Sequence, residues 1–378
     1  MEKSPAASIG KHFGELKDPR IDRTKAHLLL DIIVLAICAV ICGAETWVEV
    51  EAFGKAKHEW FKRFLELPNG IPSHDTFGRV FGMLDAEQFG RCFVNWIQAV
   101  SEVFGGQVLA VDGKQLRRSH DRTIGKDAIY MVSAWALKNQ LVLGQLKVAE
   151  KSNEITAIPQ LLETLAIGRC IVTIDALGCQ KEIAGQIITQ GADYVLALKE
   201  NQGTLYGAVK ELFEYAEETA FTDCDHHRTV NKEHGRIEIR DCWTTSAPDY
   251  LAYLPNRSDW SALHTVVMVK SERRMGAQVT TATRYYISSL TDGAKRHLET
   301  VRGHWGIENQ VHWVLDVAFD EDNSRIRKDN GPQNFAILRH IALNLLKQEK
   351  TARCGIKAKR LKAAWDERYL LTVLSGLF

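Results

Sequence analysis

Three acidic residues that lie far apart in the chain have the settings expected of a divalent-metal site. Asp112 follows the apolar run VLAV and Asp175 follows the apolar run IVTI, so each is expected at the carboxyl end of a buried strand, where ligand sites of open α/β sheets collect. Glu308 lies in the stretch HWGIENQVHWVLDVAFDED, residues 304–322. Carboxylate oxygens suit Mg²⁺ or Mn²⁺, and two such ions about 4 Å apart promote in-line displacement at a phosphodiester. We therefore predict phosphoryl transfer on DNA, with Asp112, Asp175 and Glu308 as catalytic and metal-binding residues.

The segment that carries Glu308 is expected to be a helix with one apolar stripe. At about 100° per residue, with Ile307 set at zero, its apolar side chains fall between roughly −20° and +80°. On the same scale Glu308 falls near 100° and Asp316 near 180°. We therefore expect Glu308 to reach over the edge of the sheet and Asp316 to point away from it.

Each of these residues also has a simpler interpretation. An aspartate after a strand is more often a turn or cap residue, and Glu308 could pair with His304 or His312 four residues away. The same relative position of Asp112 and Asp175 on two strands favours the metal site, because a divalent ion needs converging carboxylates.

Cysteine and histidine residues give a weaker metal signal. CDHH at residues 224–227, with His234 and Cys242 nearby, could be drawn as a zinc site, but the spacing fits no standard ligand pattern. The eight cysteines form no CxxC pair and the sequence shows no signal peptide, which indicates a reduced, cytoplasmic chain, associated with the nucleoid when acting on DNA.

Residues 1–103 are expected to form an all-helical domain. The apolar stretch 28–44 contains Asp31, and the uninterrupted part is shorter than the roughly 18 residues that a membrane-spanning helix needs, so no membrane partner is expected. LPNGIPSHDTFGRVFGML, residues 67–84, predicts a turn and a capped short helix that displays Arg79. This helix could be a DNA-recognition helix, or equally an ordinary bundle helix.

The middle of the chain changes to strand periodicity. Runs at 107–114, 128–137, 141–149, 169–176 and 193–199 predict strands, and 154–166 and 181–191 predict helices. The order βββαβαβ predicts an antiparallel meander followed by strands joined through helical crossovers. We place an α/β core with a mixed sheet at 104–200 and 291–350, a β-rich insertion at 201–290 and a basic tail at 351–378.

The net charge of +1 neither requires nor excludes a nucleic-acid partner, but residues 323–378 contain twelve Lys/Arg against four Asp/Glu. Basic side chains of the insertion, including Arg273 and Arg274, could line a DNA track. The candidate DNA-binding residues are Lys114, Arg236, Arg240, Arg302, His304, Arg325, Arg327 and Lys328.

The motifs VDGK at Asp112, TIDALG at Asp175 and HWGIENQVHWVLDVAFDED at Glu308, on this strand order, resemble the DDE transposases of bacterial insertion sequences, and most closely the H-repeat-associated proteins. The resemblance covers essentially the whole chain. It implies a ribonuclease H-like core preceded by a helical domain, and two Mg²⁺ or Mn²⁺ ions on Asp112, Asp175 and Glu308. It also implies cleavage and strand transfer at the ends of a mobile element, with DNA as partner and a homodimer as the assembly.

The chain departs from related transposases around the glutamate. Those proteins hold the DNA end with a tyrosine seven residues before it, an arginine four before and a lysine seven after, where this chain has Val301, His304 and Leu315. The charges of Arg302, His304, Arg325, Arg327 and Lys328 make them the candidate substitutes. Two alternatives stay open, namely a ribonuclease H-like nuclease without strand transfer, and a catalytically decayed or recruited DNA-binding protein.

Overall fold

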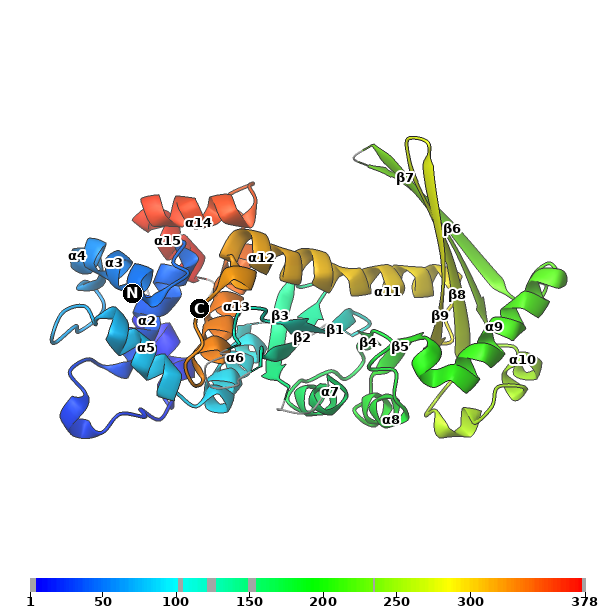
Figure 1. The fold of residues 1–378 in the computed structure, drawn as a ribbon, viewed down its shortest axis with the longest axis horizontal. Coiled ribbons are helices and arrows are strands. Elements are labelled where there is room, and N and C mark those ends of the chain that lie inside the picture. The colour runs from blue at the N-terminus through cyan, green and yellow to red at the C-terminus, as the bar shows by residue number, and fades with distance from the viewer. Residues whose placement is uncertain (1–4, 101–104, 121–126, 149–153, 234, 376–378) are drawn as a thin grey trace.

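The computed structural model describes residues 5–100, 105–120, 127–148, 154–233 and 235–375. The molecule is elongated, with a helical region at one end, a sheet flanked by helices in the middle and long projecting strands at the other end (Figure 1). No helix in these ranges is long and apolar enough to cross a membrane.

The predicted helical region contains the following helices: α1 (Pro5–Phe13), α2 (Leu29–Ile41), α3 (Trp47–Ala56), α4 (His58–Phe61), α5 (His74–Met83) and α6 (Ala86–Val100). Helix α2 lies at its centre and is buried from Asp31 to Ile41, as expected of a helix that is apolar on every side. The Ser73 hydroxyl accepts a hydrogen bond from the Thr76 amide at 3.3 Å and caps α5, as the sequence predicted. Arg79 on α5 is exposed.

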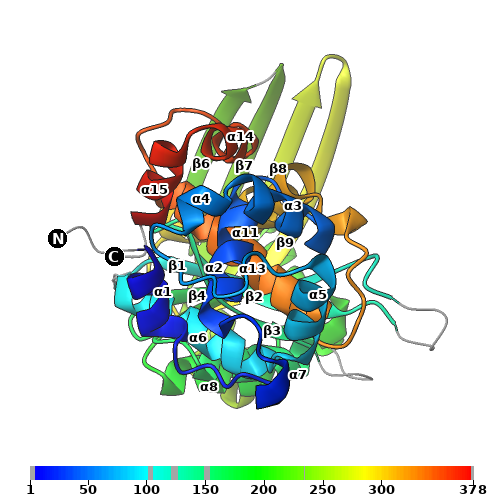
Figure 2. The ribbon, with the colours of Figure 1, turned by 90° about the vertical axis from the view of Figure 1, so that its left-hand side faces the viewer.

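The C-terminal helices belong to the same region. Helix α13 (Gly331–Gln348) packs against α2, α5 and α6, and α14 (Ile356–Trp365) and α15 (Glu367–Leu374) pack beside it (Figure 2). The first and last segments of the described chain therefore share one apolar core.

The predicted basic tail is not a free charged extension. Lys359 and Arg360 on α14 are buried. The Arg360 guanidinium donates to the Val40 carbonyl at 2.8 Å and pairs with Glu45 at 2.6 Å, while its plane lies 4.1 Å from the centre of the Phe319 ring. Counting charges along the sequence overestimated the exposed basic surface, because part of this charge stabilises helix packing.

We predict that Arg360→Met lowers the free energy of unfolding by about 3 to 5 kcal/mol, because it leaves Glu45 and the Val40 carbonyl without their partner. Urea unfolding followed by circular dichroism measures the change. Lys357→Met, at an exposed position of the same helix, is the matched control and should change stability by less than about 0.5 kcal/mol. Equal stability of the two variants would contradict the assigned role of Arg360.

In the part of the chain that the structure describes, nine strands form one mixed sheet in the order β3-β2-β1-β4-β5-β9-β8-β7-β6. Strand β2 is antiparallel to β1 and β3, whereas β4 and β5 run parallel to β1, which confirms the predicted meander and crossovers. The strands are β1 (Val108–Gln115), β2 (Tyr130–Ala136), β3 (Leu141–Lys147), β4 (Ile171–Ile174), β5 (Asp193–Leu198), β6 (Asp225–Glu233), β7 (Arg236–Thr245), β8 (Thr265–Met275) and β9 (Gln278–Ser288).

Helices cover both faces of the first five strands. Helices α7 (Glu154–Glu163) and α8 (Lys181–Thr189) lie on one face, and α11 (Ala294–Ile307) runs along the other, where it contacts β1, β4 and β5 (Figure 1). A π-helical segment (Glu308–His312) and α12 (Trp313–Phe319) continue α11 toward the helical region. Short 3₁₀ segments occupy 22–24, 200–202, 257–259 and 321–323.

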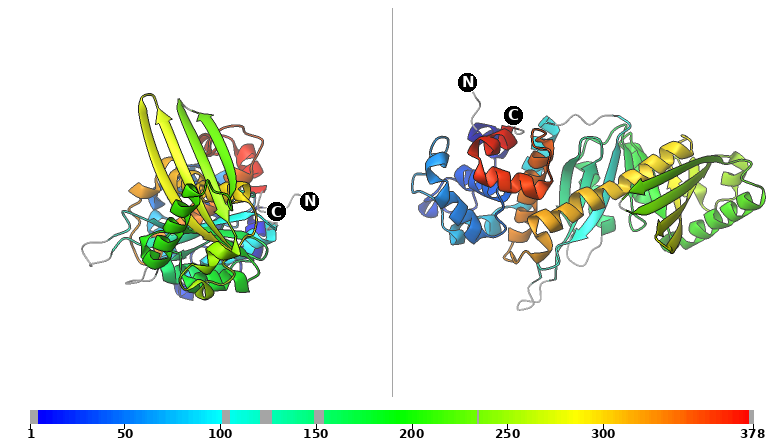
Figure 3. Two further views of the ribbon diagram at one scale, coloured as in Figure 1. Left: turned by 90° about the vertical axis from the view of Figure 1, so that its right-hand side faces the viewer. Right: turned by 90° about the horizontal axis from the view of Figure 1, so that it is seen from above.

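The insertion extends the same sheet. Strand β9 pairs antiparallel with β5, and β8, β7 and β6 follow outward, so that their far halves project beyond the helices (Figure 3). The section predicted as β-rich begins instead with a long helix, α9 (Gly203–Glu218), and also contains α10 (Pro248–Ala252). The signal for α9 is an apolar face at helical spacing, formed by Leu205, Val209, Leu212, Phe213 and Ala216.

Candidate active site

Strand pairing places the two aspartates next to each other. The parallel pairing of β1 with β4 ends at Val111 and Ile174, so Asp112 and Asp175 are the next residues on neighbouring strands. Asp112 lies within β1 and not at its end, because β1 continues to Gln115 through its pairing with β2. The predicted position at a strand end is therefore confirmed for Asp175. Asp112 instead lies where the pairing of β1 with β4 ends, while its strand continues.

Glu308 meets the aspartates from the helix that crosses the sheet. A cavity of about 200 Å³ is lined by Asp112, Asp175 and Glu308, together with Lys199 and His304. The structure thus brings the three predicted acids into one pocket.

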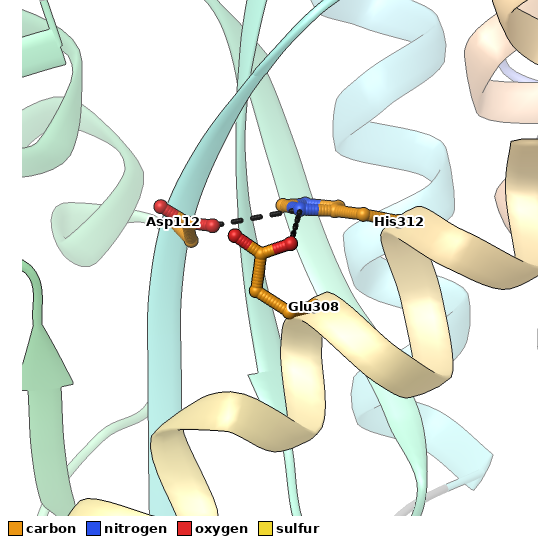
Figure 4. Close-up of side chains that lie close together, drawn as sticks. All are labelled: Asp112, Glu308 and His312. Atoms are coloured by element: carbon orange, nitrogen blue, oxygen red, sulfur yellow. Dashed lines mark ion pairs between the residues drawn. The ribbon is translucent and has the colours of Figure 1, made fainter. Parts of the chain in front are cut away.

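The His312 side chain lies close to two of these acids. Its Nδ1 lies 3.5 Å from Asp112 Oδ2 and 3.9 Å from Glu308 Oε2 (Figure 4). One possible ligand atom from each of Asp112, Glu308 and His312 lies within 4.8 Å of the other two, and within the described ranges no other group of three or more metal-ligand side chains meets this spacing. The possible zinc residues Cys224, His227 and Cys242 form no such group among the described residues, and His234 lies outside them.

The π-helical segment corrects the expected direction of Asp316. One extra residue in a turn rotates everything after it by about 100° relative to a continuous α-helix. Asp316 consequently points toward β1, where its carboxylate accepts a hydrogen bond from Lys114 Nζ. The assumption of uniform 100° steps failed because helix geometry changes between Glu308 and His312.

Lys114, a candidate DNA contact, is surrounded by internal partners. In addition to Asp316, its ammonium pairs with Glu321 at 2.9 Å and donates to the His312 carbonyl at 3.4 Å. Arg339 lies on the far side of Glu321, at 3.8 Å. These contacts attach α12 to β1 only two residues from Asp112.

We expect Lys114→Met to destabilise the protein by about 3 to 5 kcal/mol, because two carboxylates would lose their buried cation. Chemical denaturation is the measurement, and Lys295→Met at an exposed position of α11 is the control. A loss below about 1 kcal/mol would show that the Lys114 pairs are not structurally important.

The charged groups of the pocket shift one another's pKa values. Burial raises the pKa of Asp112 to about 7; the charges of Glu308 and Asp175 add to the rise and His312 opposes it. The neighbouring His312 imidazole lowers the pKa of Glu308. Asp175 is held by the amides of Leu177 at 3.0 Å and Gly178 at 3.4 Å. A set of converging hard oxygens whose charges repel one another fits a divalent cation.

A fourth acid, Glu154, lies close to this group. Its carboxylate packs directly against Gly113, and a β-carbon at that position would overlap it. Burial raises the pKa of Glu154 and the charge of Asp175 adds to the rise. Neither Glu154 nor His312 was a predicted site residue. The sequence patterns that could have indicated them are an acid at the start of the helix after β3 and a histidine four residues after Glu308.

A larger groove of about 620 Å³ continues from the acidic pocket. It lies between α11 and the inner surface of β7, β8 and β9, and the two cavities share Arg284, Tyr286, Val301 and Trp305. Trp305 is 43% exposed, with the Arg284 guanidinium 5.3 Å from its ring centre. The basic residues that line the groove are Arg236, Arg240, Arg273, Arg284 and Arg302, and the acidic ones are Glu238 and Glu272.

The candidate DNA-binding residues lie in different parts of the structure. Arg236, Arg240 and Arg302 line the groove, although Arg236 and Arg240 also pair with Glu238. His304 lines the acidic pocket, where its Nδ1 lies 3.1 Å from the Thr173 hydroxyl.

Arg325, Arg327 and Lys328 lie between α12 and α13 and line neither cavity. The Arg327 guanidinium donates to the Arg118 carbonyl at 3.1 Å.

Comparison with known proteins identifies the family. A family described as "Transposase DDE domain" matches residues 103–345, and one described as "DDE_Tnp_1-associated" matches residues 10–97. The chain belongs to the DDE transposase family. The DDE transposase match spans the sheet, the insertion and α11 to α13, and the associated region coincides with the N-terminal helices.

Individual relatives agree with this DDE transposase assignment. The chain is 40% identical over 370 residues to the "H repeat-associated putative transposase YhhI" of Escherichia coli (strain K12), covering 97% of each protein. It is 39% identical to the "Putative transposase YncI" of Escherichia coli O157:H7, covering 98% of this chain and 95% of that protein.

A solved piggyBac transposase synaptic complex with hairpin DNA aligns with a TM-score of 0.44 and 10% identity, over 98% of this chain and 76% of that one.

Proposed function

We propose that this chain is a metal-dependent DNA transposase that cleaves phosphodiesters at the ends of a mobile element and transfers the strands. The observation that carries the proposal is the convergence of Asp112, Asp175 and Glu308 in a pocket continuous with an arginine-lined groove. An acidic pocket alone would repel DNA, whereas the adjoining basic groove offers a place for the phosphate backbone.

We include a ribonuclease H-like core in the proposal. Its support is the strand order β3-β2-β1-β4-β5, with β2 antiparallel to the rest, and the helices on both faces. In this arrangement the insertion separates β5 from α11, so it can carry a DNA-binding surface without disturbing the pairing of β1 with β4.

Asp112, Asp175 and Glu308 would hold the two Mg²⁺ or Mn²⁺ ions. Such ions supply activation of a water or 3′-hydroxyl nucleophile and stabilise the departing oxygen. The chain itself orients the ligands: the Leu177 and Gly178 amides fix Asp175, and the Lys114 pairs fix the helix that carries Glu308.

The groove gives the DNA a path to the acids. Arg302 on α11 and Arg284 on β9 line the groove and would contact phosphates, and Trp305 presents an exposed ring at the junction of groove and pocket. Val301 and Leu315, at positions where related transposases hold the DNA end, are buried packing residues. DNA-end binding is therefore assigned to the groove, and assembly as a homodimer is part of the proposal by analogy with the family.

We predict that Asp112→Ala, Asp175→Ala and Glu308→Ala each reduce Mn²⁺-dependent nicking of a cognate element end by at least about a thousandfold, equivalent to about 4 kcal/mol of barrier. DNA binding should persist in gel-shift assays. Glu299→Ala, an exposed glutamate on the same helix as Glu308, is the matched control and should nick at the normal rate. An unchanged nicking rate in Asp175→Ala would refute the metal-site assignment.

A strand-joining assay with end-bearing DNA separates the two alternatives from transposition. Nicking without joining would identify a nuclease. Binding without nicking by the unmodified chain, in Mg²⁺ and in Mn²⁺, would identify a recruited DNA-binding protein.

Arg302→Ala should weaken DNA binding by a similar factor on every DNA sequence. It should also reduce the slope of the logarithm of the binding constant against the logarithm of the salt concentration by the amount expected for about one lost phosphate contact. Fluorescence anisotropy at several salt concentrations measures this slope. Lys210→Ala on α9, a surface lysine paired with Glu214 and outside the groove, should leave the slope unchanged. An equal slope for the two variants would contradict the proposal that DNA binds along the groove.

A further inference from the structure

We infer that His312 is a further metal ligand, through Nδ1, beside Asp112 and Glu308, so that the site has a mixed nitrogen and oxygen donor set. The inference deepens the proposed function and rests on it for the presence of a divalent ion in this pocket. It goes beyond the three carboxylates because it assigns a fourth side chain and alters the expected metal preference.

The first support is the direction of the imidazole. His312 is 6% exposed, and its Nδ1 points at the space between Asp112 Oδ2 and Glu308 Oε2, at 3.5 and 3.9 Å (Figure 4). Glu308 and His312 begin and end the π-helical segment, so one local feature of the backbone positions both. π-helical segments are rare and occur frequently at functional sites.

The second support is the other ring nitrogen. Nε2 of His312 is buried and makes no hydrogen bond to any residue that the structure describes. The His312 imidazole borders a cavity of about 10 Å³, which is about the size of one water molecule. The same cavity is lined by Gln145, whose side-chain amide oxygen and nitrogen also lack protein partners among the described residues.

A water in this cavity would accept a hydrogen bond from Nε2 and so hold the tautomer that a ligand requires. Metal-bound histidines donate their second ring N–H to a carboxylate, a carbonyl or a water, which leaves the first nitrogen free to coordinate. With its proton on Nε2 facing the small cavity, His312 presents the lone pair of Nδ1 to the carboxylates. The competing interpretation is an imidazolium that occupies the place of the ion and pairs with both acids.

Imidazole nitrogen is a softer donor than a carboxylate or water oxygen. A site that contains it should favour Mn²⁺ and later transition ions over Mg²⁺ more strongly than an all-carboxylate site does. An imidazolium would instead weaken the binding of both ions, because it would have to be displaced before either could bind.

The test is pulsed electron paramagnetic resonance of Mn²⁺ on the full chain without DNA, with Mn²⁺ kept below the protein concentration. We expect nitrogen modulation from a coordinated imidazole, and its frequency should change when histidine is supplied labelled with ¹⁵N. This measurement needs no substitution, so it does not depend on whether any variant folds. Wild-type spectra without histidine nitrogen modulation would overturn the inference.

Substitution identifies the histidine. His312→Gln should lose the modulation and weaken Mn²⁺ binding by about tenfold or more, with a smaller effect on Mg²⁺. His304→Gln is the matched control, because His304 lines the same pocket but its Nδ1 faces Thr173; it should keep the modulation. Loss in His304→Gln with retention in His312→Gln, or tighter Mn²⁺ binding in His312→Gln, would contradict the assignment.

These measurements are independent of catalysis. Nitrogen coordination in a protein that fails to nick DNA would leave the ligand assignment intact and refute the transposase activity. Nicking by a protein whose Mn²⁺ shows no nitrogen coupling would leave the activity intact and refute the assignment of His312 as a ligand.

Discussion

Asp112, Asp175 and Glu308 carry like charges, and their carboxylates share a pocket that is partly shielded from water. Repulsion favours separation of the acids or uptake of a proton, and burial, together with the charges of Glu308 and Asp175, raises the pKa of Asp112 to about 7. The surrounding fold opposes the separation. The ladder between β1 and β4 fixes two acids, and buried side chains of the α11 to α12 helix, Ile307 and Leu315 among them, hold the third over the sheet.

The acids along this helix differ in what neutralises them. Asp112 and Lys114 are two residues apart on β1 and therefore project from the same face. Lys114 neutralises Asp316 and Glu321, whereas no protein cation is paired so closely with Asp112 in the described residues. The negative charge that remains for a divalent ion is thus concentrated near Glu308, even though the segment contains several other acids.

Local patterns were sufficient to find Asp112, Asp175 and the order of the first five strands, because apolar runs and turns are set by neighbouring residues. They were insufficient where distant parts of the chain decide the outcome. The burial of Arg360 depends on a carbonyl of α2 that lies 320 residues away in the sequence. The π-helical segment, which sets the directions of His312 and Asp316, has no simple sequence signature. Helix α9 does have an apolar periodicity, but the strand patterns that follow it favour a β-rich assignment for the whole section.

The π-helical segment also limits how the protein can vary in length. In a continuous α-helix, Glu308 and Asp316 would lie about 80° apart around the axis, and both could not be directed at β1. The additional residue lets a single helix present one acid to the pocket and a second acid to Lys114. Deletion of one residue between them would leave the two acids seven positions and about 20° apart in a regular α-helix, whereas insertion of a further residue would rotate Asp316 by about 100° away from Lys114, so this segment should tolerate loss of the extra residue more readily than a second insertion.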